Sequence, residues 1–285
     1  MTTLRAEAFA KTNLVLKIVG KREDGYHEID TVFQTIDLTD VLEASLAPSG
    51  IELECSDPSV PAGPENLVHR AAIRWRERFG VAAGVRLRLI KRIPAGGGLG
   101  GGSSDAAVTL ALLTRLWRLS PSERDFAEVG ASLGSDVPFF FLGGTARGRG
   151  RGEILEALLD RPPQELVLIV PPFAMATRDV YEKWRPGPSP ASPGTFFGAN
   201  DLASAVLAVN SEMDRYRQAI ARYFPDCQVS GSGSSLLAAA TDPRPEDLSA
   251  LRSELPGARI LRTRTVSRAE YETRSAMGTA NFRRR

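Results

Sequence analysis

Six glycines occupy the seven positions from Gly96 to Gly102, within the stretch PAGGGLGGGSSD that begins at Pro94. Without Cβ atoms a backbone can adopt positive φ angles and turn successive N–H groups toward one anion. Residues 85–89 alternate between apolar and arginine side chains, which predicts a strand before the glycines, and a helix is predicted behind them. A strand, a glycine loop and the positive end of a helix are typical of phosphate-binding sites. The sequence therefore indicates a nucleotide held by backbone amides.

The helix behind the loop is predicted from apolar residues at helical spacing, beginning at Ala106, with Ser103 or Ser104 as its N-cap. Two familiar glycine motifs fit the stretch poorly. The spacing satisfies G-x-G-x-x-G, but no acidic residue ends a second strand about 20 residues later. The P-loop pattern fails because no lysine precedes Ser103. A flexible glycine linker is the alternative, but a regular strand and an amphipathic helix do not normally frame a linker.

Length, charge and cysteine content limit the class of protein. A chain of 285 residues has room for two domains or one large one, and a formal charge of +2 implies no strong attraction to nucleic acid or membrane. Arg283–Arg285 are expected to form a solvated tail. Cys55 and Cys227 lie far apart without a Cys/His cluster, which argues against a disulfide framework and a zinc site. With no apolar run near the ~20 residues of a membrane span and no signal-peptide core, we expect a cytoplasmic protein.

The remaining elements follow from apolar periodicity and turn residues. The pattern predicts extended segments at 4–20, 29–46 and 166–170, helices at 66–79, from about 122, around 201–224 and at 245–254, and a flexible loop at 186–198. Asn66 is the expected N-cap of the first of these helices. Alternating Arg and Gly from Arg147 to Glu153 predict a hairpin with solvated arginines, and we place a domain division there, near residue 150.

Three further segments carry potential chemistry. Lys11 and Asn13 are two residues apart, hence on the same side of a strand that is otherwise apolar. Residues 24–27, Asp-Gly-Tyr-His, form a turn that presents a ring and an imidazole side by side. Asp136 precedes a strongly apolar run, where a carboxylate is expected to be half-buried. Each also has a plain structural explanation: a surface lysine, an ordinary turn histidine and a helix-capping aspartate.

Taken together, these segments resemble one group of enzymes. The glycine stretch resembles the phosphate-binding motif of the GHMP kinase superfamily, and residues 230–233, Ser-Gly-Ser-Gly, resemble its C-terminal glycine motif. Within the superfamily, the combination of AKTNL, GKREDGYH, PAGGGLGGGSS and GSDVPFF is similar to the family that phosphorylates 4-diphosphocytidyl-2-C-methyl-D-erythritol in non-mevalonate isoprenoid biosynthesis. The resemblance runs from Ala10 to about Gly233.

The resemblance implies a fold and a reaction. The fold would be α/β (α+β), with a ribosomal-S5-like, ATP-binding domain over 1–150 and a ferredoxin-like, substrate-side domain over 151–285. The reaction would transfer the γ-phosphoryl group of ATP to the 2-hydroxyl of the cytidyl substrate, with Mg²⁺ as cofactor, in a cytoplasmic monomer or weak dimer.

The resemblance also implies residue roles. Asp136 would be the base, and Lys11 would orient it and stabilise charge in the transition state. Tyr26 and His27 would hold cytosine, Tyr181 would be a second aromatic at its other face, and Asn13 would support the substrate diphosphate or the lysine. ATP would lie on eleven consecutive residues: Pro94, Ala95, Gly96, Gly97, Gly98, Leu99, Gly100, Gly101, Gly102, Ser103 and Ser104.

Two other functions remain open at this point. One is a superfamily kinase for mevalonate, homoserine or a sugar, against which the turn at 24–27 argues, because such substrates carry no base to stack. The other is a non-catalytic nucleic-acid-binding protein with an S5-like fold, against which the near-neutral charge argues.

Overall fold

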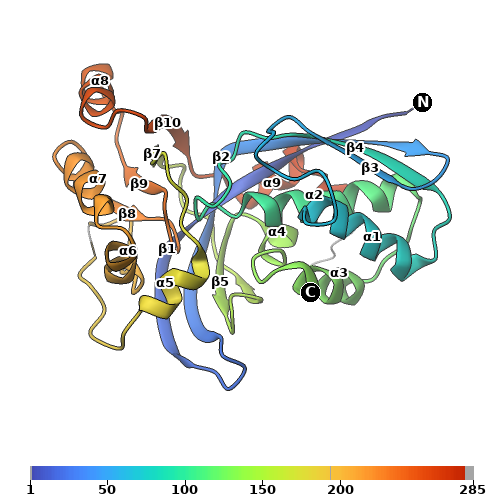
Figure 1. The fold of residues 1–285 in the computed structure, drawn as a ribbon, viewed down its shortest axis with the longest axis horizontal. Coiled ribbons are helices and arrows are strands. Elements are labelled where there is room, and N and C mark those ends of the chain that lie inside the picture. Colours follow the sequence, from blue (N-terminus) through green and yellow to red (C-terminus); the bar gives the residue numbers. More distant parts are fainter. Residues whose placement is uncertain (1, 193, 280–285) are drawn as a thin grey trace.

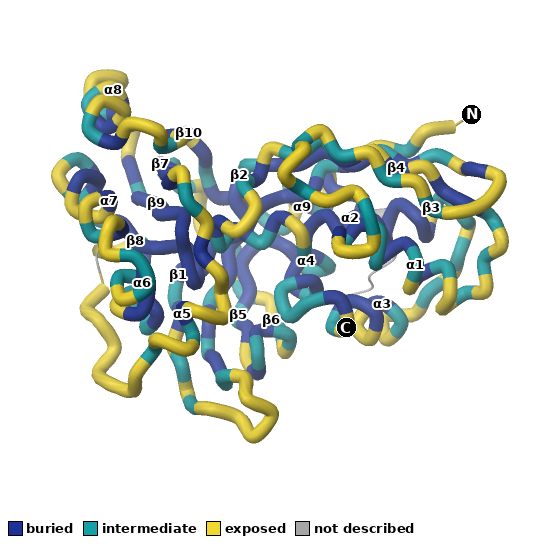
Figure 2. The backbone as a smooth tube through the Cα atoms, in the orientation of Figure 1, coloured by how far each residue is buried: buried dark blue, intermediate teal, exposed yellow. Residues whose placement is uncertain are grey.

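The computed structural model describes residues 2–192 and 194–279, so the expected arginine tail lies outside the described residues. Its first sheet contains β1 (Leu4–Lys21), β2 (His27–Ala47), β3 (Ile51–Cys55), β4 (Gly84–Ile90), β5 (Thr145–Arg149) and β6 (Ile154–Ala157). The strand order is β3-β4-β2-β5-β6, and β1 pairs with β2. The β1–β2 hairpin is long and projects below the rest of the molecule, ending in an exposed turn (Figures 1 and 2).

Four helices pack with the first sheet: α1 (Leu67–Phe79), α2 (Gly101–Leu116), α3 (Glu123–Leu133) and α4 (Phe139–Leu142). Helix α2 is buried from Ser104 to Thr114, because it contacts the sheet as well as α1 and α3. The predicted cap of α1 is confirmed, since Asn66 Oδ1 accepts the Val68 N–H at 2.9 Å. The helix expected from about residue 122 begins with Ser122 in a capping box.

The predicted cap of α2 is wrong. Gly100, with φ of 69°, is the N-cap, and the helix begins at Gly101. A Cβ on Gly100 would lie 2.9 Å from both Lys11 Cγ and Phe140 Cζ, so the chain passes these side chains too closely for any residue but glycine. The turn into the helix is therefore made by glycine, and Ser103 and Ser104 lie inside the first turns.

The second sheet contains β7 (Glu165–Val170), β8 (Cys227–Val229), β9 (Leu236–Ala239) and β10 (Arg259–Arg264), in the antiparallel order β10-β7-β9-β8. Helices α5 (Thr177–Lys183), α6 (Ala203–Val209), α7 (Glu212–Ala221) and α8 (Pro245–Glu254) accompany it (Figure 1). The predicted loop at 186–198 contains neither helix nor strand in its described part.

Strand β7 shows why the two sheets form one body. Val167 and Ile169 face the helices of the second sheet. Leu166, Leu168 and Val170, on the opposite face, join an apolar cluster that also contains residues of β1, β2 and the glycine loop. The continuous apolar run of this strand is thus explained, because both of its faces are buried.

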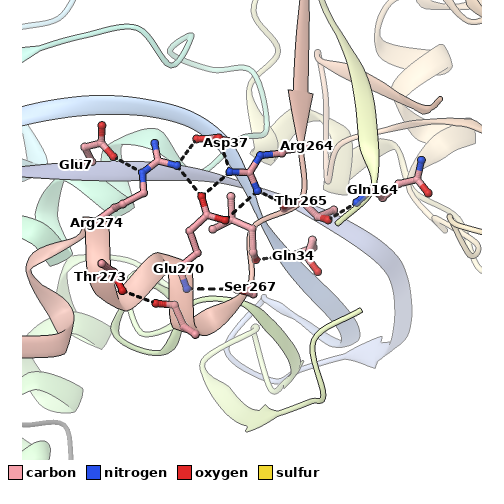
Figure 3. Close-up of polar contacts among 12 residues, drawn as sticks. Glu7, Gln34, Asp37, Gln164, Arg264, Thr265, Ser267, Glu270, Thr273 and Arg274 are labelled. Carbon is pink, nitrogen blue, oxygen red and sulfur yellow. Dashed lines mark hydrogen bonds and ion pairs between the residues drawn. The ribbon is translucent and has the colours of Figure 1, made fainter. Parts of the chain in front are cut away.

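The chain then returns to the first sheet through α9 (Arg268–Arg274) and the 3-10 helix η1 (Ala276–Thr279). Figure 3 shows the ion pairs that fix this return. The Arg274 guanidinium lies 2.8 Å from carboxylate oxygens of both Glu7 on β1 and Asp37 on β2. Arg264 on β10 pairs with Asp37 at 3.1 Å and with Glu270. A charged network therefore ties both sheets to the C-terminal helix.

Strand β6 belongs to the first sheet and β7 begins the second. The proposed domain division near residue 150 lies in the hairpin that joins β5 and β6, and it stays a prediction. Within the described ranges 2–192 and 194–279, no helix is both long enough and apolar enough to cross a membrane.

Candidate active site

A cleft of about 1380 Å³ opens where β1, the glycine loop, the β1–β2 turn and α5 come together. The structure brings nearly all of the predicted site residues to this cleft. Ser104 is the exception, because it is fully buried in α2 and does not line the cleft. The predicted residues that line it are Lys11, Asn13, Tyr26, His27, Pro94, Ala95, Gly96, Gly97, Gly98, Leu99, Gly100, Gly101, Gly102, Ser103, Asp136 and Tyr181.

The glycine loop has the backbone pattern of an anion nest. Gly96, Gly98 and Gly100 have φ values of 69°, 72° and 69°, and the residues between them do not have positive φ. Such alternation turns neighbouring N–H groups toward one point. A Cβ on Gly98 would lie 2.3 Å from the Ser230 carbonyl oxygen and 2.8 Å from that of Gly233, so the loop needs glycine there for close packing as well as for its φ angle.

The second glycine turn, residues 230–233, supports the first loop. The Ser230 hydroxyl donates to the Gly98 carbonyl at 3.0 Å, and the Ser235 N–H donates to the Gly97 carbonyl at 3.2 Å. A Cβ on Gly231 would lie 3.1 Å from Asn13 Oδ1 and 3.5 Å from Lys11 Nζ. The turn therefore closes one wall of the cleft against both the loop and β1.

Lys11 and Asp136 meet inside the cleft. Lys11 Nζ lies 3.5 Å from Asp136 Oδ2 and donates to Asn13 Oδ1 at 2.9 Å. Asn13 in turn donates to the Thr31 hydroxyl at 2.7 Å, and Lys11 Nζ lies 5.5 Å from the centre of the Phe33 ring. The lysine side chain is 5% exposed and that of Asp136 is 35% exposed. A fixed ammonium thus stands beside a carboxylate that remains open to a ligand.

Lys11 is also bound to the glycine loop through its backbone. Its N–H donates to the Leu99 carbonyl at 2.9 Å. The phosphate nest and the lysine–aspartate pair therefore belong to one connected piece of structure.

Aromatic rings gather at the other end of the cleft. The His27 ring lies 5.1 Å from the Tyr181 ring, tilted by 31°, and 5.5 Å from the Trp184 ring, which meets it edge-on. Burial lowers the pKa of His27, and the charge of Lys21 lowers it further, which favours a neutral imidazole. Burial raises the pKa of Tyr181, and the Asp136 carboxylate adds to this effect. Tyr26 is 55% exposed at the mouth of the cleft.

Arg151 shows where the prediction of solvated arginines fails. Its guanidinium lies 4.8 Å over the ring of Tyr26, and it lines the cleft. The alternation of Arg and Gly in this hairpin gave no sign of a ring partner 125 positions earlier in the chain. Trp184 was also missed: it follows directly after α5, three residues beyond Tyr181, and the sequence pattern predicted no helix there that would bring the two rings to one side.

At this site, bound phosphates would have to supply part of the oxygen ligands of a metal ion. Among the described residues, no group of three or more His, Cys, Asp or Glu side chains is placed to hold a metal. Ser103 lies near the segment that carries Asp136, since a Cβ on Gly134 would be 3.7 Å from the Ser103 hydroxyl. One hydroxyl and one carboxylate therefore flank the space in front of the loop.

Comparisons with known proteins agree with this geometry. The family model of the GHMP kinases N terminal domain matches residues 66–144. A 4-diphosphocytidyl-2-C-methyl-D-erythritol kinase of Moorella thermoacetica is 49% identical over 210 residues, which cover 73% of this chain and 72% of that protein. One of Pelotomaculum thermopropionicum is 49% identical over 188 residues, or 66% of each chain.

Solved structures agree as well. A crystal structure of 4-(cytidine 5'-diphospho)-2C-methyl-D-erythritol kinase superimposes with a TM-score of 0.79 at 35% identity, covering 93% of this chain and 100% of that one. A mevalonate kinase structure covers 93% of this chain and 99% of its own with a TM-score of 0.66, but at 13% identity it shows the fold alone.

The two sheets and the paired glycine turns define a GHMP kinase, which uses ATP, and the expected fold class is confirmed. Within this class, the chain belongs to the family of 4-diphosphocytidyl-2-C-methyl-D-erythritol kinases.

Proposed function

We propose that this chain transfers the γ-phosphoryl group of ATP to the 2-hydroxyl of 4-diphosphocytidyl-2-C-methyl-D-erythritol, the substrate for which its relatives are named. This places it in non-mevalonate isoprenoid biosynthesis. The observation that carries the proposal is one cleft in which the Lys11–Asp136 pair lies between a glycine nest and an aromatic pocket. A kinase acting on a cytidyl alcohol needs these three parts in this order.

Asp136 accepts the proton of the 2-hydroxyl as the hydroxyl oxygen attacks the γ-phosphorus. The O–H bond breaks, a new O–P bond forms, and the bond between the γ-phosphorus and the β-γ bridging oxygen breaks, so that ADP leaves with the electron pair. Lys11, 3.5 Å from Asp136, keeps that carboxylate oriented and stabilises the negative charge on the group being transferred. Asn13 fixes the lysine through its 2.9 Å hydrogen bond.

The glycine loop and the first turn of α2 hold the phosphates through backbone N–H groups. A Cβ on Gly98 or Gly100 would clash with neighbouring protein atoms, so the backbone at these two positions must stay free of side chains. Ser103 is the residue whose hydroxyl would hold Mg²⁺ together with phosphate oxygens. Mg²⁺, when bound, neutralises phosphate charge. Ser104 contributes only through its backbone, because its side chain is buried.

The aromatic end of the cleft selects cytosine. Tyr26 supplies an exposed ring for stacking, and the neutral imidazole of His27 can donate one hydrogen bond and accept another at the base edge. Tyr181 lies beside His27, so it bounds the same pocket, and the Trp184 ring meets the imidazole edge-on.

The proposal includes a cytoplasmic location and a monomer or weak dimer. Cys55 and Cys227 are both free thiols, as a reducing compartment requires. Sedimentation at several protein concentrations tests the oligomeric state.

The decisive experiment is the Asp136→Asn variant, assayed with the cytidyl substrate, 2-C-methyl-D-erythritol phosphate, mevalonate and homoserine. The wild-type enzyme should consume ATP with the cytidyl substrate alone. The variant should lose at least ~100-fold in kcat while its Kd for ATP stays unchanged, because a general base acts only in the chemical step. Asp214→Asn, a half-exposed aspartate on α7, is the matched control and should keep full activity. Near-normal turnover by Asp136→Asn, or equal turnover of mevalonate by the wild type, would overturn the proposal.

A further inference from the structure

A buried ionic cluster lies beneath the glycine loop and is not part of the cleft. It consists of Asp40 on β2, Lys91 directly after β4, and Asp105 on α2. Lys91 Nζ donates to Asp105 Oδ2 at 2.9 Å and to Asp40 Oδ2. The three side chains are 0%, 5% and 3% exposed, in the same order. Removing an ammonium and two carboxyl groups from water costs free energy, so their positions need an explanation beyond a surface ion pair.

The cluster holds the chain at both ends of the loop. Asp40 Oδ1 accepts the backbone N–H groups of Arg92 and Ile93, the latter at 2.8 Å, immediately before the loop begins at Pro94. Asp105 lies in α2, three residues after the last loop glycine. Both ends of the loop are therefore bound to a single ammonium group, that of Lys91.

The ammonium also lies directly under the start of α2. A Cβ on Gly101 would be 2.9 Å from Lys91 Nζ and 2.8 Å from Ile93 Cγ2. Gly101 and Gly102, which belong to this helical turn, both line the cleft. Any shift of Lys91 must therefore move the N–H groups that the proposed function assigns to phosphate.

A loop made almost entirely of glycine cannot hold its own shape. Glycine loses more conformational freedom on ordering than any other residue, and it has no side chain with which to pack. The outer side of the loop is fixed by Ser230 of the second turn and by Ser235, two residues after that turn. The cluster holds the base of the loop together with two backbone hydrogen bonds, from the Lys11 N–H to the Leu99 carbonyl and from the Lys91 N–H to the Ser56 hydroxyl, both 2.9 Å long. Apolar contacts of Ile93 and Leu99 add to this support.

We propose that Asp40, Lys91 and Asp105 are positioning residues that hold the empty glycine loop in the conformation that binds ATP. None of the three side chains lines the cleft. One ammonium between two carboxylates leaves no excess positive charge to attract phosphate, so the cluster acts through geometry. This proposal rests on the phosphate-binding role of the loop in the proposed function.

The test compares Asp105→Ala with Asp105→Asn. Asp105→Ala removes the acceptor on α2 and leaves Lys91 paired with Asp40, so the start of the helix is released. The Kd for ATP should rise roughly 10- to 100-fold, the range expected for one lost hydrogen bond to a charged group. The Kd for the cytidyl substrate should stay the same, and kcat at saturating ATP should stay within about 3-fold, because bound ATP orders the loop. Asp105→Asn keeps an oxygen acceptor for Lys91 and should bind ATP within about 3-fold of wild type.

Amide hydrogen exchange gives a readout that a purely structural role would not change. In protein without nucleotide, amides from Ala95 to Gly102 should exchange faster in Asp105→Ala than in Asp105→Asn. If Asp105→Ala does not fold, Asp105→Leu removes the same acceptor while filling the space.

Thr114→Val is the matched control on the same helix. It removes the buried hydrogen bond from Trp75 Nε1 to the Thr114 hydroxyl, 3.1 Å long, far from the loop. It should lower the melting temperature and leave the Kd for ATP unchanged. If Asp105→Ala behaves like Thr114→Val in ATP affinity and loop exchange, the positioning role is refuted. If Gly98→Ala also leaves ATP affinity unchanged, the phosphate-binding role of the loop fails as well.

Discussion

Replacing Gly98 by alanine tests the glycine loop most directly. Gly98 has φ of 72°, where an L-residue costs about 1–2 kcal/mol, and the new Cβ would lie 2.3 Å from the Ser230 carbonyl oxygen. The loop and the second turn must separate, which breaks the 3.0 Å hydrogen bond from Ser230 to the Gly98 carbonyl, worth about 0.5–1.5 kcal/mol. To bind ATP, the variant must restore the strained arrangement. The sum of about 1.5–3.5 kcal/mol corresponds to a roughly 10- to 300-fold rise in the Kd for ATP.

Gly50→Ala separates the effect of φ from that of the close contact. Gly50 has φ of 75°, but a Cβ there would meet nothing within 4 Å, and it lies in the turn between β2 and β3. Both variants should lose stability through backbone strain, whereas only Gly98→Ala should lose ATP affinity. Calorimetric titration with ATP and thermal melting of each variant give the two quantities separately. A folded Gly98→Ala protein that binds ATP as tightly as the wild type would refute this account of the loop.

The remaining predictions concern the aromatic end of the cleft. Tyr26→Ala should raise the Kd for the cytidyl substrate about 5- to 150-fold, the range for one lost stacking ring, and leave that for ATP unchanged, as two calorimetric titrations would show. Tyr181→Ala should also raise the Kd for the cytidyl substrate if the Tyr181 ring faces the base. If this variant changes only the NMR titration of His27, Tyr181 supports the imidazole and does not bind the base. Because burial lowers the pKa of His27, its NMR titration should have a midpoint below 6.5, and a higher midpoint would contradict the burial argument. The unfolded chain then binds the proton more tightly, so His27 should lower the free energy of unfolding as the pH falls below about 6.5, an effect absent in His27→Gln.

Local signals in the sequence predicted the parts of the site that depend on backbone shape. The glycine stretch, the cap at Asn66 and the buried strand β7 each follow from residues close together in the chain. Lys11 and Asn13 were expected on one side of a strand, and their 2.9 Å hydrogen bond confirms that they are. These predictions succeeded because a glycine, a cap or an alternation of residues acts within a few positions.

Contacts between distant segments were not predictable in this way. Asp40 lies 51 positions before Lys91, which in turn lies 14 positions before Asp105, and charged residues are expected at the surface unless a partner is known. Arg151 was expected in solvent for the same reason, since its ring partner lies in another hairpin. The start of α2 was misplaced because the side chains that force Gly100 to be glycine, Lys11 and Phe140, come from elsewhere in the fold.

The connection between β1 and the glycine loop explains how these parts should differ in their kinetic effects. The Lys11 N–H binds the Leu99 carbonyl at 2.9 Å, while its ammonium faces Asp136, so a loop ordered by ATP also places the ammonium for catalysis. A change that only loosens the empty loop should therefore raise the KM for ATP and leave kcat nearly intact, because the cost of ordering falls on binding. Removing Asp136 should lower kcat, because its interaction strengthens only in the transition state. Within residues 2–192 and 194–279, no hydrogen bond joins Lys11 to the exposed turn that carries Tyr26, so changes in that turn should affect only the binding of the alcohol substrate.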